Sequence, residues 1–419
     1  MAARRSVFTL AQLPDRIEDN WLQTSKSLRR QGQFDAARYA LRNAEQHGLS
    51  ADESLLQECR ILKDSGQIYK ALTMLEPVEL DLVSSGVRGA VKDFNSSLSS
   101  STSSKSRKDR GGRDGGGAGD SSSLPAYLAT DEKRKRFAEK LLLATHLMVD
   151  SKTKHGTVII ERFKLVTELK QRWDLAHFEL ARYYEVLYHN AKAKEEQVIH
   201  MKASGAGGSP RGGSSKSSSV ATAGDKDEPL SFSYVVNAVH QYNKCIAYGS
   251  GNDLIVRALP RMLTLWMSFT SLSVSDVFPP VGDAHRHSNA GGQANMLDNY
   301  QRNVQANVKR YASQNPASTW FQCLPQLVSR IGHPTYETRE TIKLIISLVL
   351  RAYPQQSIWH LGCLLQSVIS DARSAGVDLI RRATRELEGG VGSRKHEATM
   401  LKHSVVFFKN LVELAAHQT

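Results

Sequence analysis

Two glycine-rich stretches are the first places where this chain could do chemistry. Gly111–Gly119 and Gly205–Gly213 have the glycine content of a phosphate-binding loop, but such a loop needs its glycines at fixed offsets between a strand and a helix. No strand pattern precedes either stretch and serine surrounds both, so a linker is the favoured interpretation. Neither a His-Arg-Asp nor an Asp-Phe-Gly tripeptide occurs, so no catalytic loop or magnesium-binding element of a protein kinase is visible.

The histidine and cysteine residues give little indication of a catalytic or metal-binding site. His285 and His287, beside Asp283, could be metal ligands, but they fall in a predicted loop without supporting groups. His177 shares an apolar helix face with Trp173, which is typical of a core histidine rather than a catalytic base. The cysteines are far apart and form no CxxC pair, so neither a zinc site nor a disulfide framework fits, and a reducing compartment is expected. They are Cys59, Cys245, Cys323 and Cys363.

The chain is basic, with 55 Lys and Arg against 42 Asp and Glu and a formal net charge of +13. Lys133–Arg136 resembles a nuclear-localisation patch, although it also opens an amphipathic helix. Aromatic residues are not interleaved with the charges as on a single-strand-binding surface, so we expect no direct nucleic-acid contact. No apolar run approaches the roughly 20 residues of a membrane-spanning helix, so no membrane contact is expected either.

Apolar residues recur at helical spacing. After Thr130, a predicted N-cap, Phe137, Leu141, Ala144 and Met148 follow at i, i+4, i+7 and i+11. No alternating strand pattern and no Asn-Gly or Asp-Gly hairpin signal between apolar runs is found. The sequence therefore predicts an all-α protein.

A 34-residue repeat opens the chain, and 34 residues is the period of the tetratricopeptide helix–turn–helix unit. Glycine recurs where the first helix must end and reverse, and alanine recurs where the second helix must approach the first closely. Large apolar residues recur between the helices. Trp21, Gly32, Phe34 and Ala37 correspond to Leu55, Gly66, Ile68 and Ala71.

Two Ser/Gly-rich inserts divide the helical segments. Residues 93–129 and 202–229 contain almost no large apolar side chains, so both are predicted to be disordered. The predicted fold is a tetratricopeptide-like α-solenoid of antiparallel helix pairs with these two inserts. Its parts are two tetratricopeptide-like repeats in 1–92, a linker in 93–129, helical repeats in 130–201, an insert in 202–229, and further helical repeats in 230–419.

Three strings resemble signatures of one kinase family. Trp173–Tyr184 resembles the Trp-x-x-x-His-Phe-x-Leu-x-x-Tyr-Tyr signature of FAT domains in ATR-type kinases. Ala258–Phe269 is similar to that family's Pro-Arg-hydrophobic-Leu-Thr-Leu-Trp helix, and Ala352–Trp359 to its Tyr-Pro-Gln-Gln-x-x-Trp element. The strings occur in the family's order, after the 34-residue repeats. The signature residues are Trp173, His177, Phe178, Tyr183, Tyr184, Pro260, Arg261, Trp266, Tyr353, Pro354 and Trp359.

All of these signature residues are predicted to be packing residues, and no catalytic, cofactor-binding or metal-binding role is assigned to any of them. Trp173 and Trp266 are large enough to anchor a core. Pro260 could begin a helix at its first position. Tyr353 and Pro354 should end one helix, and Trp359 should seat the next.

The resemblance implies that 130–201 and 230–419 are FAT-type repeats that wrap around and hold a C-terminal kinase domain. By the same resemblance, this chain has no cofactor of its own, and ATP and Mg²⁺ belong to the kinase domain. The implied partners are that kinase domain in cis, an ATR-interacting-type protein and a second copy of the chain. The implied process is the DNA-damage and replication-stress checkpoint, in the nucleus.

Two hypotheses remain open, because the sequence stops at Thr419 before any kinase core and its Ser/Gly inserts are untypical of the family. In the first, the chain is the regulatory scaffold of an ATR-like Ser/Thr kinase. In the second, it is a stand-alone tetratricopeptide-like adaptor that binds a peptide in its groove. In both, we expect the chain alone to have no kinase activity.

Overall fold

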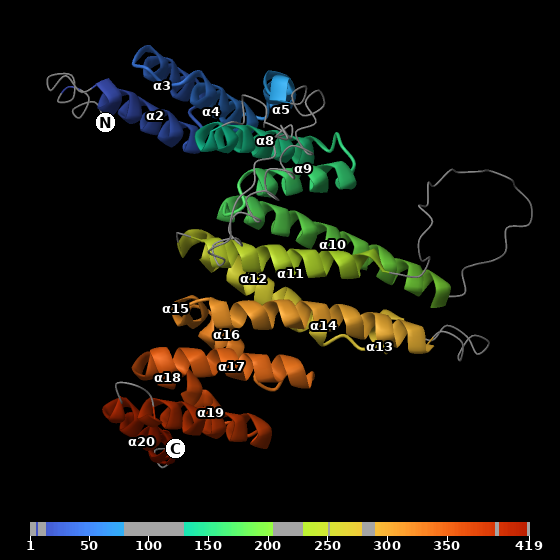
Figure 1. The fold of residues 1–419 in the computed structure, drawn as a ribbon, viewed down its shortest axis with the longest axis vertical. Coiled ribbons are helices and arrows are strands. Elements are labelled where there is room, and N and C mark those ends of the chain that lie inside the picture. Colours follow the sequence, from blue (N-terminus) through green and yellow to red (C-terminus); the bar gives the residue numbers. More distant parts are fainter. Residues whose placement is uncertain are drawn as a thin grey trace, which may run out of the picture. The chain divides into compact units, whose positions relative to one another are not determined.

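The computed structural model describes residue 6 and residues 14–78, 130–203, 229–249, 252–278, 290–389 and 394–416. Among these residues every regular element is a helix, which confirms the all-α prediction (Figure 1). The predicted insert 93–129 and nearly all of 202–229 lie outside the described residues, as do both glycine-rich stretches and the loop that contains His285 and His287. The chain divides into two compact units, Met1–Ala176 and His177–Thr419.

The first unit consists of antiparallel helix pairs joined by short turns. In chain order its helices are α2 (Pro14–Arg30), α3 (Phe34–Gln46), α4 (Ala51–Asp64), α5 (Ile68–Met74), α8 (Asp131–Ser151) and α9 (Gly156–Leu169). Each of the pairs α2–α3, α4–α5 and α8–α9 packs together, and α4 also packs against α3 and α8. This is the arrangement that the helix–turn–helix repeat predicts.

The second unit contains both longer and shorter helices than the first. Helix α10 (Asp174–Ala203) begins in the last residues of the first unit and continues into the second. The others are α11 (Leu230–Tyr248), α12 (Asn252–Thr270), α13 (Val274–Val277), α14 (Ala290–Gln314), α15 (Ala317–Phe321), α16 (Leu324–Ser329), α17 (Tyr336–Ala352), α18 (Pro354–Leu365), α19 (Ser370–Gly389) and α20 (Lys395–Ala416).

The backbone confirms the 34-residue repeat. Gly32 and Gly66 follow α2 and α4 with φ angles of +76° and +82°. No atom lies within 4 Å of the position that a Cβ would take at either glycine, so the left-handed backbone rather than crowding requires glycine here. Ala37 and Ala71 are fully buried, where α3 packs on α2 and α5 packs on α4.

The repeat also includes a side-chain contact that apolar spacing did not reveal. Ser25 Oγ donates to the carbonyl oxygen of Ala37 at 2.8 Å, and Cys59 Sγ donates to that of Ala71 at 3.8 Å. Donor and acceptor both shift by one repeat. Burial raises the pKa of the Cys59 thiol to about 11, with the neighbouring Glu58 charge acting in the same direction, so the thiol keeps its proton and remains a donor. The same contact therefore joins α2 to α3 in the first repeat and α4 to α5 in the second.

Helix α8 begins as the sequence predicts. Thr130 Oγ1 accepts a hydrogen bond from the backbone N–H of Lys133 at 3.3 Å, and the four predicted core positions from Phe137 to Met148 are buried. The basic run that follows Thr130 is bound to carboxylates of the protein itself. Arg136 contacts Glu53 at 2.5 Å and Glu132 at 3.2 Å.

A single buried amide, that of Gln305 on α14, joins three helices of the second unit. Its Oε1 accepts from Trp266 Nε1 on α12 at 2.9 Å and from Thr338 Oγ1 on α17 at 3.2 Å. Its Nε2 donates to the carbonyl oxygen of Glu337 at 3.0 Å and to Thr341 Oγ1 at 2.6 Å. Two donors and two acceptor positions are all that an amide side chain has. The group is therefore fully satisfied in a site where an unpaired polar group would be costly.

Helix α12 ends without a glycine cap, and its last carbonyl groups are bound by side chains from elsewhere. Gln301 Nε2 donates to the carbonyl oxygens of Phe269 and Leu272 at 3.1 and 2.9 Å. Thr335 Oγ1 donates to that of Thr270 at 2.6 Å, and His333 Nε2 contacts that of Met267 at 2.9 Å. The carbonyls of Met267 and Phe269 also accept from the N–H groups of Ser271 and Leu272, so the side chains supplement the backbone hydrogen bonds at this helix end.

The prediction that Pro260 begins a helix is wrong, because α12 starts at Asn252 and Pro260 lies inside it. Proline has no N–H to donate to the preceding turn. The helix nevertheless continues, because the residues on both sides of the proline are held in the core: Leu259, Met262 and Leu263 are fully buried.

Replacing Trp266 with Ala should strongly destabilise the second unit. The indole is fully buried and supplies one of the two hydrogen bonds to Gln305 Oε1. Truncation of a buried aromatic residue costs on the order of 3–5 kcal/mol. Thermal and urea unfolding followed by circular dichroism would measure this. The matched control is Trp359→Ala, which removes an exposed indole and should cost less than about 1 kcal/mol. Equal losses for the two variants would contradict the packing described here.

Candidate interaction site

The first signature lies on α10 and faces the core of the second unit. Phe178 is buried, with its ring 6.0 Å from that of Tyr242 and the guanidinium of Arg257 4.9 Å from its ring centre. His177 is also buried, and its Nδ1 donates to Gln241 Oε1 at 2.7 Å. The prediction of a satisfied core histidine is confirmed. Tyr184 is buried as well, and Tyr183 is half-buried.

Trp173 does not share this face, contrary to the sequence prediction. Helix α10 begins one residue after it, and the tryptophan lies in the first unit, only half-buried. The ammonium group of Lys170 lies 5.5 Å from the centre of its ring. Because the residue is outside the helix, helical spacing does not determine its direction.

The first and second signatures meet through a residue that sequence reasoning missed. Glu185, directly after Tyr184, accepts from Tyr242 Oη at 2.5 Å and from the guanidinium of Arg261 at 2.9 Å, both at Oε2. Burial, followed by the hydrogen bond to Glu185, raises the pKa of Tyr242, so the phenol keeps its proton. Arg261, predicted to be a packing residue, instead joins α12 to α10 by an ion pair. The signal was a lone acidic residue beside a run of aromatic residues.

The third signature lies between α17 and α18. Tyr353 follows the last residue of α17 and Pro354 is the first residue of α18, as predicted. The Tyr353 ring packs on that of Phe321 at 5.6 Å. Pro354 is buried at the first helical position, where its missing N–H has no helical partner to lose.

Trp359, predicted to be a packing residue, is largely exposed, so the prediction holds only for its edge-on contacts with α20. Its side chain is 63% exposed on α18. Its ring nevertheless contacts two rings of α20 edge-on, Phe407 at 6.0 Å and Phe408 at 5.6 Å. The resemblance that suggested packing identifies the residue but does not show which side of the helix it occupies.

Helix α20 carries two apolar stripes. One stripe faces inward at Leu401 and Phe408, which are buried, whereas Val412, one turn further on, is exposed. Close packing with α18 requires Gly362, because a Cβ there would lie 2.6 Å from the Phe408 ring. A second stripe, at i, i+4 and i+7, is exposed next to Trp359. We call Trp359 together with this second stripe the outer face; its residues are Trp359, Phe407, Leu411 and Leu414.

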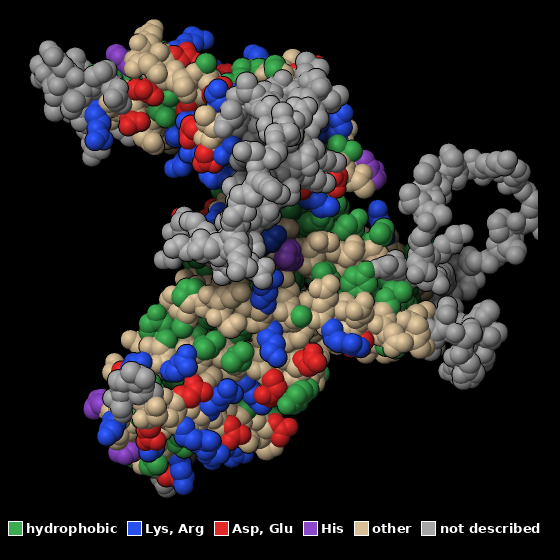
Figure 2. All heavy atoms as spheres, in the orientation of Figure 1, with side chains coloured by type: hydrophobic (Ala, Val, Ile, Leu, Met, Phe, Trp, Pro, Cys, Tyr) green, Lys and Arg blue, Asp and Glu red, His purple; other side chains and the backbone are tan. Residues whose placement is uncertain are grey.

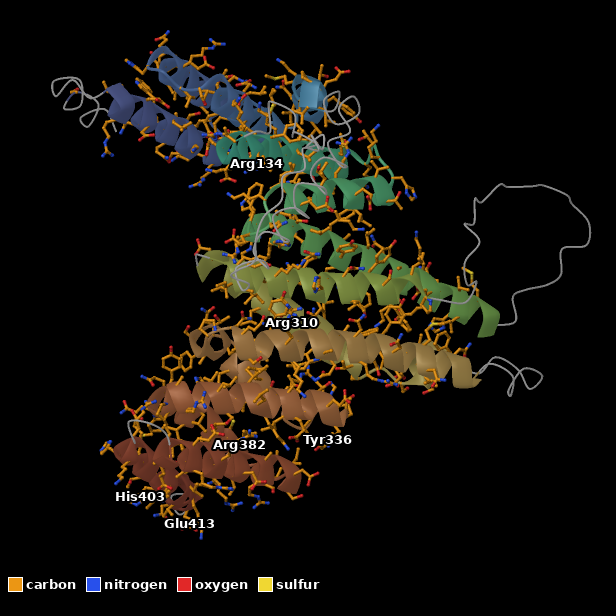
Figure 3. All side chains as sticks on the ribbon, viewed as in Figure 1. Arg134, Arg310, Tyr336, Arg382, His403 and Glu413 are labelled. Carbon is orange, nitrogen blue, oxygen red and sulfur yellow. The ribbon has the colours of Figure 1, made fainter. Side chains whose placement is uncertain are left out.

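Trp359 also lines a groove. It has a volume of about 1160 Å³ and lies among α12, α16, α17, α18 and α19. Exposed Tyr336, at the start of α17, also lines it (Figure 3). Basic and acidic side chains line the groove in equal numbers, so charge favours neither kind of ligand. They are Arg330, Arg339, Lys343, Glu340, Asp371 and Asp378.

The remaining surface of these helices is solvated and charge-balanced. On the face that Figure 2 shows, basic and acidic side chains are mixed over α17, α18 and α19. Glu386 pairs with Arg382 at 3.2 Å and with Arg351 at 3.5 Å. Exposed pairs of this kind contribute little to stability. The apolar outer face therefore stands out from its surroundings.

Reactive groups do not gather in the part of the chain that the structure describes. No cluster of three or more His, Cys, Asp or Glu side chains there could hold a metal ion. Cys59, Cys245 and Cys323 are buried and Cys363 is exposed, all as free thiols. No described helix is long and apolar enough to cross a membrane. Within these ranges, the features best suited to recognition are surfaces.

Comparison with known families agrees with this architecture. A model of the FAT domain matches residues 1–264. The chain belongs to the FAT-domain family. A second model, described as serine/threonine-protein kinase ATR-like HEAT repeats, matches residues 303–406. The α10 signature lies within the FAT match, and the Tyr353–Trp359 element lies within the ATR-like match. The resemblance to the FAT region of ATR-type kinases is thus confirmed, while the domain boundaries predicted at 130 and 230 stay predictions.

Known proteins with similar sequences include kinases named ATR and rad3. The chain is 26% identical to the serine/threonine-protein kinase ATR of Arabidopsis thaliana over 389 residues, which is 92% of this chain and 13% of that protein. It is 24% identical over 394 residues to the rice (Oryza sativa subsp. indica) protein of the same name, covering 94% of this chain. Protein kinase rad3 of Schizosaccharomyces pombe is 20% identical over 188 residues. This FAT-family chain spans 13% of the length of its plant relatives.

His240 on α11 lies near His177 of the α10 signature and near the charged side chains of Lys244 and Arg310. Asn307 Nδ2 donates to His240 Nδ1 at 2.7 Å, which requires a neutral imidazole. Burial, with the nearby charges of Lys244, His177 and Arg310, lowers the pKa of His240 to about 4. Arg310, one turn after Asn307 on α14, is labelled in Figure 3.

Acid should destabilise the second unit through His240. The unfolded chain binds this proton near pH 6.5 and the folded chain near pH 4, so the stabilisation is complete above pH 6.5 and is lost as the pH falls towards 4. Between pH 7 and 4.5, His240→Gln should lose ~1–2 kcal/mol less unfolding free energy than the parent, after allowance for solvent screening. Urea unfolding at both pH values would measure the difference. Exposed His403→Gln is the control, and parallel losses in all three proteins would refute the assignment.

Proposed function

We propose that this chain is the regulatory scaffold region of an ATR-like Ser/Thr protein kinase that acts in the DNA-damage and replication-stress checkpoint. The FAT match, the ATR-like HEAT match and the similarity to proteins named serine/threonine-protein kinase ATR support this proposal. The kinase domain lies in the same polypeptide, binds ATP and Mg²⁺, and transfers the phosphoryl group. The protein works in the nucleus.

The exposed, apolar outer face is the main structural support for the scaffold role. A helix with apolar residues on two sides is normally covered on both, and exposed apolar patches mark sites of protein contact. Trp359 is 63% and Leu414 is 65% exposed. Aromatic rings of this kind supply much of the binding energy at protein interfaces. We infer that the outer face packs against the polypeptide that carries the kinase domain and helps to hold it in place.

The other partners in the proposal are an ATR-interacting-type protein and a second copy of the same kinase. The similarity to ATR-type kinases supports both, and we assign neither of them to a particular surface. The stand-alone adaptor remains the alternative function. It differs from the scaffold proposal in one respect that can be measured, because an adaptor would not need a kinase core against the outer face.

A kinase assay tests the proposal. The chain alone, and the chain fused to the C-terminal kinase core of its Arabidopsis relative, are incubated with labelled ATP and a peptide that contains Ser-Gln. We expect transfer only from the fusion, because phosphoryl transfer needs positioned phosphate contacts and bound metal. In the fusion, Phe407→Asp with Leu411→Asp should lower the activity at least 10-fold by placing two charges in the contact.

The matched control is Val368→Asp, at a residue that is 95% exposed and lies outside the outer face. It should leave the fusion as active as the parent. Transfer by the isolated chain, abolished by a point mutation within it, would sink the scaffold proposal. A fusion whose activity is insensitive to both outer-face charges would equally argue against it and in favour of the adaptor.

A further inference from the structure

A pocket in the first unit is a second candidate for recognition. Side chains of α2, α4 and α8, together with Trp173, surround a pocket of about 420 Å³. This volume falls within the range of small-ligand and peptide side-chain sites. Trp173 is half-buried here. It does not share the core-facing side of α10 that the other residues of the first signature occupy.

The 34-residue repeat places cations in this pocket. Lys26 on α2 and Arg60 on α4 occupy the same repeat position, 34 residues apart, and both line the pocket. Arg136 and His146 of α8 line it as well. Successive first helices of the repeat thus present basic side chains to one cavity, which Trp173 also lines.

Two carboxylates lie in the same pocket, but other groups already bind them. Glu53 contacts Arg136 at 2.5 Å and Lys26 at 3.5 Å, and accepts from Gln57 Nε2 at 2.8 Å. Burial acts to raise the pKa of Glu53, but these partners outweigh burial and hold it below the ordinary value, so the group is charged. Glu139 lies 3.7 Å from Arg136.

Arg60 contributes to the lowered pKa of Glu53 through its charge but forms no ion pair of its own among the described residues. Within the described ranges no carboxylate lies within 4 Å of its guanidinium, although the side chain is half-buried. A guanidinium fork matches a carboxylate with two parallel hydrogen bonds. The neighbouring indole offers a flat apolar surface that pairs with aliphatic or aromatic side chains.

We propose that this pocket binds a short acidic segment of a partner protein, with one carboxylate on Arg60 and an adjacent apolar side chain against Trp173. Lys26 and Arg136 add positive potential, which favours a segment with more than one acidic residue. The chemistry that defines the partner is an acidic residue next to a leucine or phenylalanine. This proposal is independent of the kinase-scaffold function, because it concerns a different unit and a different surface.

Fluorescence anisotropy with the full chain tests it. The probe is a fluorescein-labelled peptide, Gly-Asp-Leu-Glu-Phe-Asp-Leu-Gly, compared with its counterpart in which Asn and Gln replace Asp and Glu. We expect the acidic peptide to bind at least 10-fold more tightly, and its affinity to fall as salt is raised. Arg60→Gln and Trp173→Ala should each weaken the binding at least 5-fold, whereas Arg60→Lys, which keeps the charge, should weaken it less.

The control is Arg16→Gln, which removes an exposed cation from α2 outside the pocket and should bind the peptide like the parent. Melting curves establish that each variant is folded, and the Arg60→Lys comparison does not depend on a disruptive change. Equal affinities for the acidic and amide peptides, or unchanged binding by Arg60→Gln, overturn the proposal. So does tighter binding of a labelled single-stranded oligonucleotide with the same dependence on Arg60 and Trp173, which would assign the pocket to nucleic acid.

Discussion

The buried amide of Gln305 is the contact on which the centre of the second unit depends. Its four hydrogen bonds join α12, α14 and α17 at one point. A buried polar group that has all its partners favours one packing arrangement. Any other arrangement that removes a partner leaves the group unsatisfied and costs free energy. Apolar side chains could pack these helices at several depths and rotations. The amide accepts only the arrangement that brings the Trp266 indole and the first turn of α17 to it together.

Other polar contacts extend the same principle to neighbouring helices. Glu185 fastens α12 to α10 through Arg261 and to α11 through Tyr242. Glu195 of α10 accepts from the N–H and the hydroxyl of Ser231, at the positive end of α11. Since side chains fix the helix positions, the outward surfaces of the same helices can carry recognition residues. Trp359 lies on such a surface in the second unit. In the first unit, Trp173 lines a pocket that the helix repeat forms.

Much of this fold could be predicted from the sequence, because repeat spacing and apolar stripes report local geometry. Gly32 and Gly66 mark the turns, Thr130 caps a helix, and Trp266 is buried as expected of a large core anchor. The polar links could not be predicted, since Gln305 and Glu185 look like surface residues until a distant helix supplies their partners. Pro260 was misplaced because tertiary packing can hold a proline inside a helix. Trp359 was misplaced because a matching signature identifies the residue but does not show which side of α18 it occupies.

Native-state hydrogen exchange tests the account most directly, because it measures whether the three helices joined by Gln305 open together. Amides of α12, α14 and α17 should share one opening free energy, the highest in the second unit, and α20 should exchange at lower cost. A Gln305→Leu variant should separate the three helices into distinct opening reactions. If α14 exchanges several kcal/mol more easily than α12 and α17 in the parent protein, the amide does not unite them, and the central claim is wrong.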